Sequence, residues 1–207
     1  MSELAHKRST MALYSGPTDP YSHRVRMVLA EKGIAVDILD IEKTAKIKEE
    51  LLELNPYGKA PLLIDRDLVL FQPDIIMEYL DERFPHPPLM PVYPVARARS
   101  RLMIYRLNAD WCALMDKILS GTQVAAARKE LMEGIVGVAS AFLETPFFFS
   151  EEFSLIDCCL LPLLWRLPVL GITLPLEAKP VLAYAERLFE RSSFLASLTE
   201  AERMMKQ

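Results

Sequence analysis

The sequence predicts an α/β domain followed by an all-helical domain. Over the first 80 or so residues, short apolar runs alternate with helical patterns and turn residues, which is typical of a strand-helix-strand arrangement. Beyond a proline-rich stretch the apolar spacing is helical throughout. We therefore expect an α/β domain over residues 10–84, a proline-rich linker over 85–94 and an all-helical domain over 95–207.

The elements of the first half follow from apolar spacing and turn residues. Met11–Ser15 is a short apolar run that ends in a turn-rich loop, and the helical spacing behind this loop stops at Gly33. Alternating apolar and polar residues predict a strand over Ile34–Ile41, and a charged helix follows from about Ala45 to Leu54.

A hairpin and a third helix complete the first domain. The runs Leu62–Ile64 and Leu68–Phe71 flank a short polar turn, as the two strands of a hairpin would. A helix from Pro73 to about Arg83 follows, because proline is well suited to the first turn of a helix.

The stretch Phe84–Pro94 holds five of the fifteen prolines, so we expect a stiff, extended connection. Behind it, apolar residues recur at helical spacing in two series. These are Trp111, Leu114, Met115, Ile118 and Leu131, Ile135, Val138, Phe142. Ser154 can cap a buried apolar helix whose first turn holds Asp157, and a last helix is expected around Val181–Glu190.

Composition argues against several functional classes. No Gly-x-Gly-x-x-Gly or Gly-x-x-x-x-Gly-Lys occurs among the seven glycines, which disfavours nucleotide binding through a glycine-rich phosphate loop. Three cysteines and three scattered histidines lack metal-ligand spacing, so neither a metal nor a cofactor is expected. The longest apolar stretch, Cys158–Trp165, is too short to span a bilayer, and the start has no secretory pattern, so we expect a cytoplasmic protein without membrane contact.

Charge argues against strong direct binding of nucleic acid, because the net charge is −4. The best basic candidate is the group Arg97, Arg99, Arg101 and Arg106. We interpret this group as the polar side of a solvated helix. Contact with DNA is then expected only indirectly, through a protein partner.

The order of these elements, with Ala60-Pro61 before the hairpin, resembles the glutathione S-transferase architecture over nearly the whole chain. The resemblance implies a thioredoxin-like first domain. It also implies a cis bond before Pro61, with Ala60 at the position that offers its backbone to the cysteinyl part of glutathione.

Some of the residues that are catalytic in that family are absent from this sequence. Asp19-Pro20-Tyr21-Ser22 stands where glutaredoxin-like members have Cys-Pro-Tyr-Cys, so both cysteines are absent. A carboxylate beside a bound thiol raises the thiol pKa, which is the wrong direction for activation. The hydroxyls of Ser15, Thr18, Tyr14 and Ser22 remain as possible donors, with turn or capping roles as the alternative.

A second departure lies at the start of the third helix. Glutathione-binding relatives carry Glu/Gln-Ser there, and the serine hydroxyl and N–H hold a carboxylate. This chain has Gln72-Pro73, which removes both donors at about 1–3 kcal/mol each.

Longer motifs narrow the resemblance to the stringent starvation protein A family, glutathione-transferase-like bacterial factors that bind RNA polymerase and lack transferase activity. They are Tyr21–Arg26, Phe84–Ala98, Phe153–Cys158 and Ser193–Glu202. Relatives commonly keep Glu-Ser-Arg where this chain has Gln72-Pro73-Asp74, a departure that weakens glutathione binding further and lies outside the polymerase-binding motif.

The family resemblance implies a homodimeric, non-enzymatic transcription regulator. Its expected partner is RNA polymerase holoenzyme, contacted through the primary sigma factor, during starvation or acid stress. Independently, a stiff proline segment with aromatic faces loses little entropy on binding and makes a good recognition surface. By the family resemblance, the expected partner-binding residues are the positions that match the family's ridge, Phe84, Pro85, His86, Pro87, Leu89 and Tyr93, with Arg66 as a basic neighbour.

Two alternatives remain open at this point. The protein could be a glutathione-dependent transferase or peroxidase that uses Ser15 or a neighbouring hydroxyl. It could also be a module that carries another small molecule in the ancestral cleft. The proline segment itself could merely space two domains, with Phe84 and Leu89 tucked into their junction.

Overall fold

The computed structural model describes residues 11–205 and divides the chain into two compact units. The first runs up to Pro87 and also includes Ala196–Met205, and the second is Pro88–Leu195. The division therefore falls inside the predicted linker. Residues 196–205 group with the α/β unit, whereas the sequence analysis assigned them to the helical domain.

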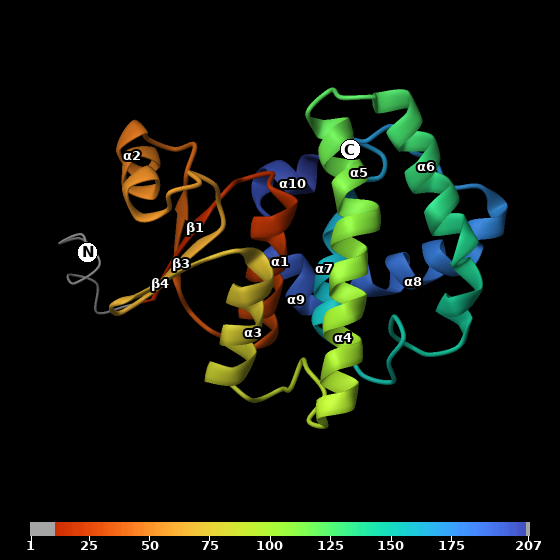
Figure 1. The fold of residues 1–207 in the computed structure, drawn as a ribbon, viewed down its shortest axis with the longest axis horizontal. Coiled ribbons are helices and arrows are strands. Elements are labelled where there is room, and N and C mark those ends of the chain that lie inside the picture. The colour runs from red at the N-terminus through yellow and green to blue at the C-terminus, as the bar shows by residue number, and fades with distance from the viewer. Residues whose placement is uncertain (1–10, 206–207) are drawn as a thin grey trace. The chain divides into compact units, whose positions relative to one another are not determined.

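The first unit is built on a four-stranded mixed sheet (Figure 1). Its strands are β1 (Ala12–Ser15), β2 (Asp37–Asp40), β3 (Leu62–Asp65) and β4 (Leu68–Phe71), in the order β2-β1-β3-β4. β1 pairs parallel with β2 and antiparallel with β3, and β3 pairs antiparallel with β4. A parallel neighbour requires a crossover, which α1 (Pro20–Glu31) supplies.

Helices cover both faces of this sheet. α1 and α3 (Pro73–Arg83) pack on each other and on one face, while α2 (Ala45–Leu54) lies on the other (Figure 1). On the α2 side, Leu51 packs against Tyr14 and Leu62. The alternation of side chains along each strand thus serves two cores, as a sheet with helices on both faces requires.

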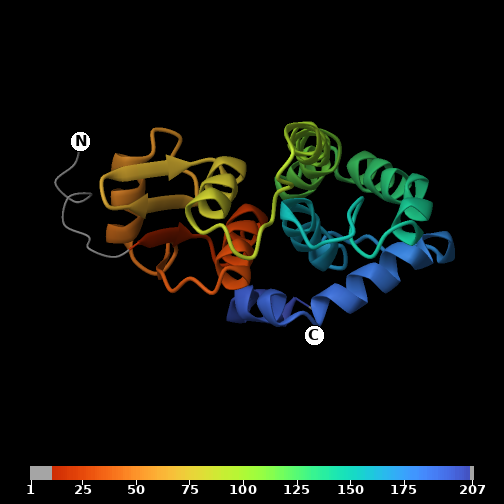
Figure 2. The same ribbon diagram turned by 90° about the horizontal axis from the view of Figure 1, so that it is seen from below.

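The second unit is helical (Figure 2). Its helices, including the π-helical segment η2 and the 3₁₀ turns η3 and η4, are α4 (Pro94–Arg106), η2 (Leu107–Cys112), α5 (Ala113–Leu119), α6 (Val124–Gly137), η3 (Ala139–Leu143), α7 (Leu155–Arg166), η4 (Leu176–Ala178) and α8 (Lys179–Phe189). α9 (Ser192–Ser197) spans the division between the two units, and the last described helix, α10 (Glu200–Met204), belongs to the first unit. The π-helical segment was not predicted, because a single wide turn is too short for apolar spacing to distinguish it from an α-helical turn.

α7 is the buried helix that the sequence predicts. All twelve of its residues are buried, and α4 and α8 pack against it. Ser154 and Asp157 form the capping box at its start. Among residues 11–205, no helix is long and apolar enough to cross a membrane.

Candidate functional site

The proline segment, defined here as residues 84–94, begins where α3 ends. The Phe84 N–H still donates to the Leu80 carbonyl at 3.0 Å, and the Phe84 ring is half-buried with the Arg83 guanidinium 5.3 Å from its centroid. Pro85, His86 and Pro87 then follow with exposed side chains, and the His86–Pro87 peptide bond is cis. The first unit therefore presents three consecutive predicted contact residues to solvent.

The part of the segment that belongs to the second unit has one buried and one exposed contact candidate. Leu89 is only 2% exposed, and its carbonyl accepts the Leu155 N–H at 2.9 Å beside the start of α7. Tyr93 is 78% exposed at the N-cap of α4. Leu89 thus anchors the segment to the second unit, while Tyr93 lies on the surface.

Arg66 lies on the exposed turn between β3 and β4, with φ at 59°. Its neighbour Asp65 connects this hairpin to the last turns of α3. Asp65 pairs with Arg83 at 3.7 Å and accepts the Tyr79 hydroxyl at 2.6 Å. Burial and the nearby Asp65 carboxylate both raise the pKa of Tyr79, so this hydroxyl remains a donor at neutral pH.

The hydroxyls proposed for thiol chemistry have structural partners in the first unit. Ser15 is 2% exposed and its Oγ accepts from the Arg26 guanidinium at 2.5 Å. The Ser22 Oγ donates to Asp19 at 2.6 Å and accepts the Gly16 N–H at 3.0 Å. The Tyr14 hydroxyl donates to Glu50 at 2.9 Å. Three of the four candidates are therefore used in holding the fold, and Thr18 alone is exposed.

Asp19 caps α1. Its carboxylate accepts the Ser22 N–H at 2.7 Å, which satisfies a donor at the helix start. This is the capping role that sequence analysis gave as the alternative to catalysis for this loop.

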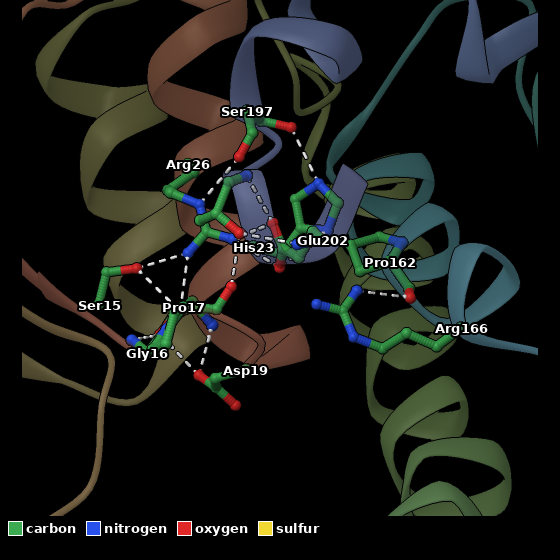
Figure 3. A network of polar contacts seen from close by, with 12 residues as sticks. Ser15, Gly16, Pro17, Asp19, His23, Arg26, Pro162, Arg166, Ser197 and Glu202 are labelled. Carbon is green, nitrogen blue, oxygen red and sulfur yellow. Dashed lines mark hydrogen bonds and ion pairs between the residues drawn. The ribbon is translucent and has the colours of Figure 1, made fainter. Parts of the chain in front are cut away.

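A buried ionic network ties the chain's end to the same β1–α1 loop (Figure 3). The Arg26 guanidinium donates to both carboxylate oxygens of Glu202, at 2.7 and 2.6 Å, and to the Ser197 carbonyl at 2.9 Å. Thr199 donates to the Pro17 carbonyl at 2.6 Å, and the His23 Nε2 lies 2.9 Å from the Ser197 Oγ. This network was not predicted, because no local sequence pattern links positions that lie 171 to 182 residues apart.

The start of α3 already carries a carboxylate of its own. Asp74 lies in the first helical turn, 3.7 Å from the buried Arg24 guanidinium. Pro73 supplies no N–H, and Gln72 is held at φ 89°, a region that favours glycine. The Asp74 charge complements the positive end of the α3 helix dipole.

One feature implied by the resemblance is retained. The Ala60–Pro61 bond is cis, and Pro61 is buried next to the start of β3. The cis bond of the thioredoxin-like scaffold is therefore present, while Ser15, Ser22 and Asp74 are engaged in contacts within the first unit.

Comparisons with known proteins agree with this picture. Residues 9–82 match the family model described as glutathione S-transferase, N-terminal domain. A stringent starvation protein A homolog of Pasteurella multocida is 53% identical over 96% of this chain and 94% of its own length. One from Coxiella burnetii is 50% identical over 97% of each chain.

Solved structures show the same fold. The tau class glutathione S-transferase MiGSTU from mango superposes with a TM-score of 0.80 at 25% identity, covering 96% of both chains. With a glutathione S-transferase fold and half of all positions shared with those relatives over nearly the full length, the chain belongs to the stringent starvation protein A family.

Proposed function

We propose that this protein is a non-enzymatic transcription regulator that binds RNA polymerase holoenzyme, through the primary sigma factor, in starvation and acid stress. The observation that carries the proposal is the exposure of Pro85, His86 and Pro87 in a family whose relatives are named for stringent starvation. Two prolines in three residues fix most of the backbone before binding, so a partner gains contact area at a small entropy cost.

The absence of an enzymatic role is part of the proposal. Asp19 caps α1, and Ser15 and Ser22 are buried in hydrogen bonds, so activating a thiol there requires these bonds to be broken. Pro73 and Asp74 likewise disfavour a bound carboxylate at α3. The retained cis Ala60–Pro61 bond is the observation that favours the alternative, a glutathione-dependent transferase or peroxidase.

A homodimer is also proposed. α4 exposes Val95, Leu102 and Tyr105, at 67%, 59% and 68%, and spacings of seven and three residues put them on one helical face. The helix is therefore more than the solvated polar surface that the sequence analysis expected. An apolar stripe of this kind, flanked by Arg99 and Arg106, suits a second copy of the same surface.

The test of the proposed function compares three proteins in capture of purified RNA polymerase holoenzyme. Wild type is expected to capture the enzyme, and the P85A/H86A/P87A variant is expected to lose at least about tenfold in affinity. The control P56A/K59A/P168A changes three other exposed residues and is expected to bind as wild type does. In a second experiment, glutathione is titrated calorimetrically into the wild-type protein. A micromolar dissociation constant would favour the enzymatic alternative.

A further inference from the structure

The backbone of the exposed residues 85–87 accepts a hydrogen bond from a buried ammonium group. Lys32, the C-cap residue of α1, has a side chain that is 0% exposed. Its Nζ donates to Asp81 of α3 at 2.6 Å and also to the carbonyl of Pro87. All three residues belong to the first unit.

The contact of Lys32 with Asp81 and the Pro87 carbonyl can hold the backbone in place, and we call it the clamp. An ammonium group has three donors, and here one is used on a carboxylate and one on a main-chain carbonyl. Asp81 is only 7% exposed at its side chain, so it balances the Lys32 charge away from solvent. The donor that reaches Pro87 is thereby held in place by α1 and α3 together.

The clamp completes the attachment of residues 84–87 at both ends. At the near end, the Phe84 N–H bonds to Leu80 of α3, and at the far end the Pro87 carbonyl bonds to Lys32. Between these points Pro85, His86 and Pro87 keep their side chains in solvent. The surface is therefore free to contact a partner while its backbone is fixed.

We propose that Lys32 and Asp81 are positioning residues that hold the Phe84–Pro87 backbone in its partner-binding conformation. The inference rests on the proposed function for its consequence, because the affected partner is RNA polymerase holoenzyme. Neither residue needs to touch the polymerase. Their effect is to remove the ordering cost that a loose segment would pay when it binds.

The variant K32M/D81N tests the role without leaving a lone buried charge. Methionine keeps much of the lysine length, and asparagine keeps the shape of Asp81, so the pair loses its charges together. The matched control K129M/E133Q removes a lysine-acid pair on α6 whose side chains are 73% and 61% exposed. Both variants leave the net charge unchanged.

Two measurements are made on each full-length protein. Holoenzyme affinity is expected to fall about tenfold in K32M/D81N, equivalent to about 1.4 kcal/mol, and to stay at the wild-type value in the control. Hydrogen exchange is expected to accelerate at the amide of Phe84, which bonds to Leu80, and to remain unchanged in the β1–β3 strand pair.

A double-mutant cycle that combines K32M/D81N with H86A separates a positioning role from a general structural effect. If Lys32 and Asp81 act through the segment, then K32M/D81N costs less affinity in the H86A background than in the wild-type background. Equal losses in both backgrounds would show that the pair acts elsewhere and would overturn the inference.

The outcomes distinguish this inference from the proposed function. Unchanged affinity and unchanged exchange in K32M/D81N, with binding lost in P85A/H86A/P87A, would refute the positioning role and leave the function standing. If P85A/H86A/P87A binds as wild type does, the function fails. In that case accelerated exchange at Phe84 still supports the clamp, and unchanged exchange refutes it.

Discussion

Glu202 is fully buried, and its carboxylate contacts Arg26, Thr199 and His23. It receives two hydrogen bonds from Arg26, and its Oε2 accepts the Thr199 N–H at 3.0 Å within the capping box of α10. A buried charge is tolerated only when it is paired and hydrogen-bonded, which is the case here. The residue thus connects the last helix to the loop that holds Ser15 and Gly16.

The substitution Glu202→Ala is expected to lower the free energy of unfolding by about 3–5 kcal/mol, because it leaves the Arg26 guanidinium buried without its carboxylate. Urea denaturation followed by circular dichroism measures this. The control Glu133→Ala breaks the exposed pair with Lys129 and is expected to cost no more than about 1 kcal/mol. A loss below about 1 kcal/mol for Glu202→Ala would contradict the assigned role of this pair.

Asp157 illustrates how burial and hydrogen bonds compete at one side chain. Burial raises the pKa of this carboxyl above its usual value, although the Tyr184 hydroxyl at 2.6 Å and the N–H groups of Phe148 and Ser154 all lower it. Burial and the neighbouring Asp157 charge in turn raise the pKa of Tyr184 well above 10, so Tyr184 stays protonated and donating at neutral pH. Desolvation is the largest effect at both residues.

Tyr184→Phe is expected to destabilise the protein in a pH-dependent manner. In the wild type, the Tyr184 hydroxyl donates to Asp157 and favours its charged form. Removing this donor raises the folded-state pKa of Asp157 further above the unfolded value. A raised carboxyl pKa lowers stability as pH rises, so the variant loses more stability at pH 7 than at about pH 4.5. The expected loss at pH 7 is about 1–3 kcal/mol. Equal losses by urea denaturation at both pH values would show that Asp157 does not sense the hydroxyl.

Among the helices, α7 buries its apolar side chains, whereas α4 exposes several of its own. α7 is apolar on every side and is buried throughout, with Trp165 packed edge-on against Phe189 at 4.9 Å between ring centroids. α4 buries Ser100 and Ile104 but exposes three large apolar side chains. A helix with apolar residues on its exposed face is suited to association with another chain.

The variant L102E/Y105E is expected to shift the protein from dimer to monomer, since two buried carboxylates on each side of a symmetric interface repel one another. Sedimentation equilibrium gives the mass directly. The control E130Q/E133Q changes exposed residues of α6 and should remain dimeric. A wild-type protein that sediments as a monomer even at about 10 times the concentration used in the binding titrations would refute the dimer proposal.

For the whole molecule, the sequence was sufficient to predict the layers and most elements. Local signals such as the capping pair at Ser154 and Asp157, or the helix start at Pro73, appear in the structure as expected. Contacts between distant segments were not accessible in this way. The Arg26–Glu202 pair spans 176 positions, and it explains why residues 196–205 join the α/β unit.

The candidate site was predictable only in part for the same reason. Prolines and aromatics marked the segment in the sequence, yet burial of Leu89 and exposure of Tyr93 depend on the helices packed around each. The Lys32 contact with Pro87 joins residues 55 positions apart. A lysine next to a helix-ending glycine has no sequence signal that separates it from an ordinary surface lysine.

Binding of purified RNA polymerase, titrated against wild type and P85A/H86A/P87A, tests the central claim most directly. Titrations with core enzyme and with holoenzyme containing the primary sigma factor show whether sigma supplies the contact. The account predicts tight binding of wild type to holoenzyme, weaker binding to core and a loss of at least about tenfold for the variant. Equal affinity of wild type and the folded variant for holoenzyme, or no binding by either, would contradict it.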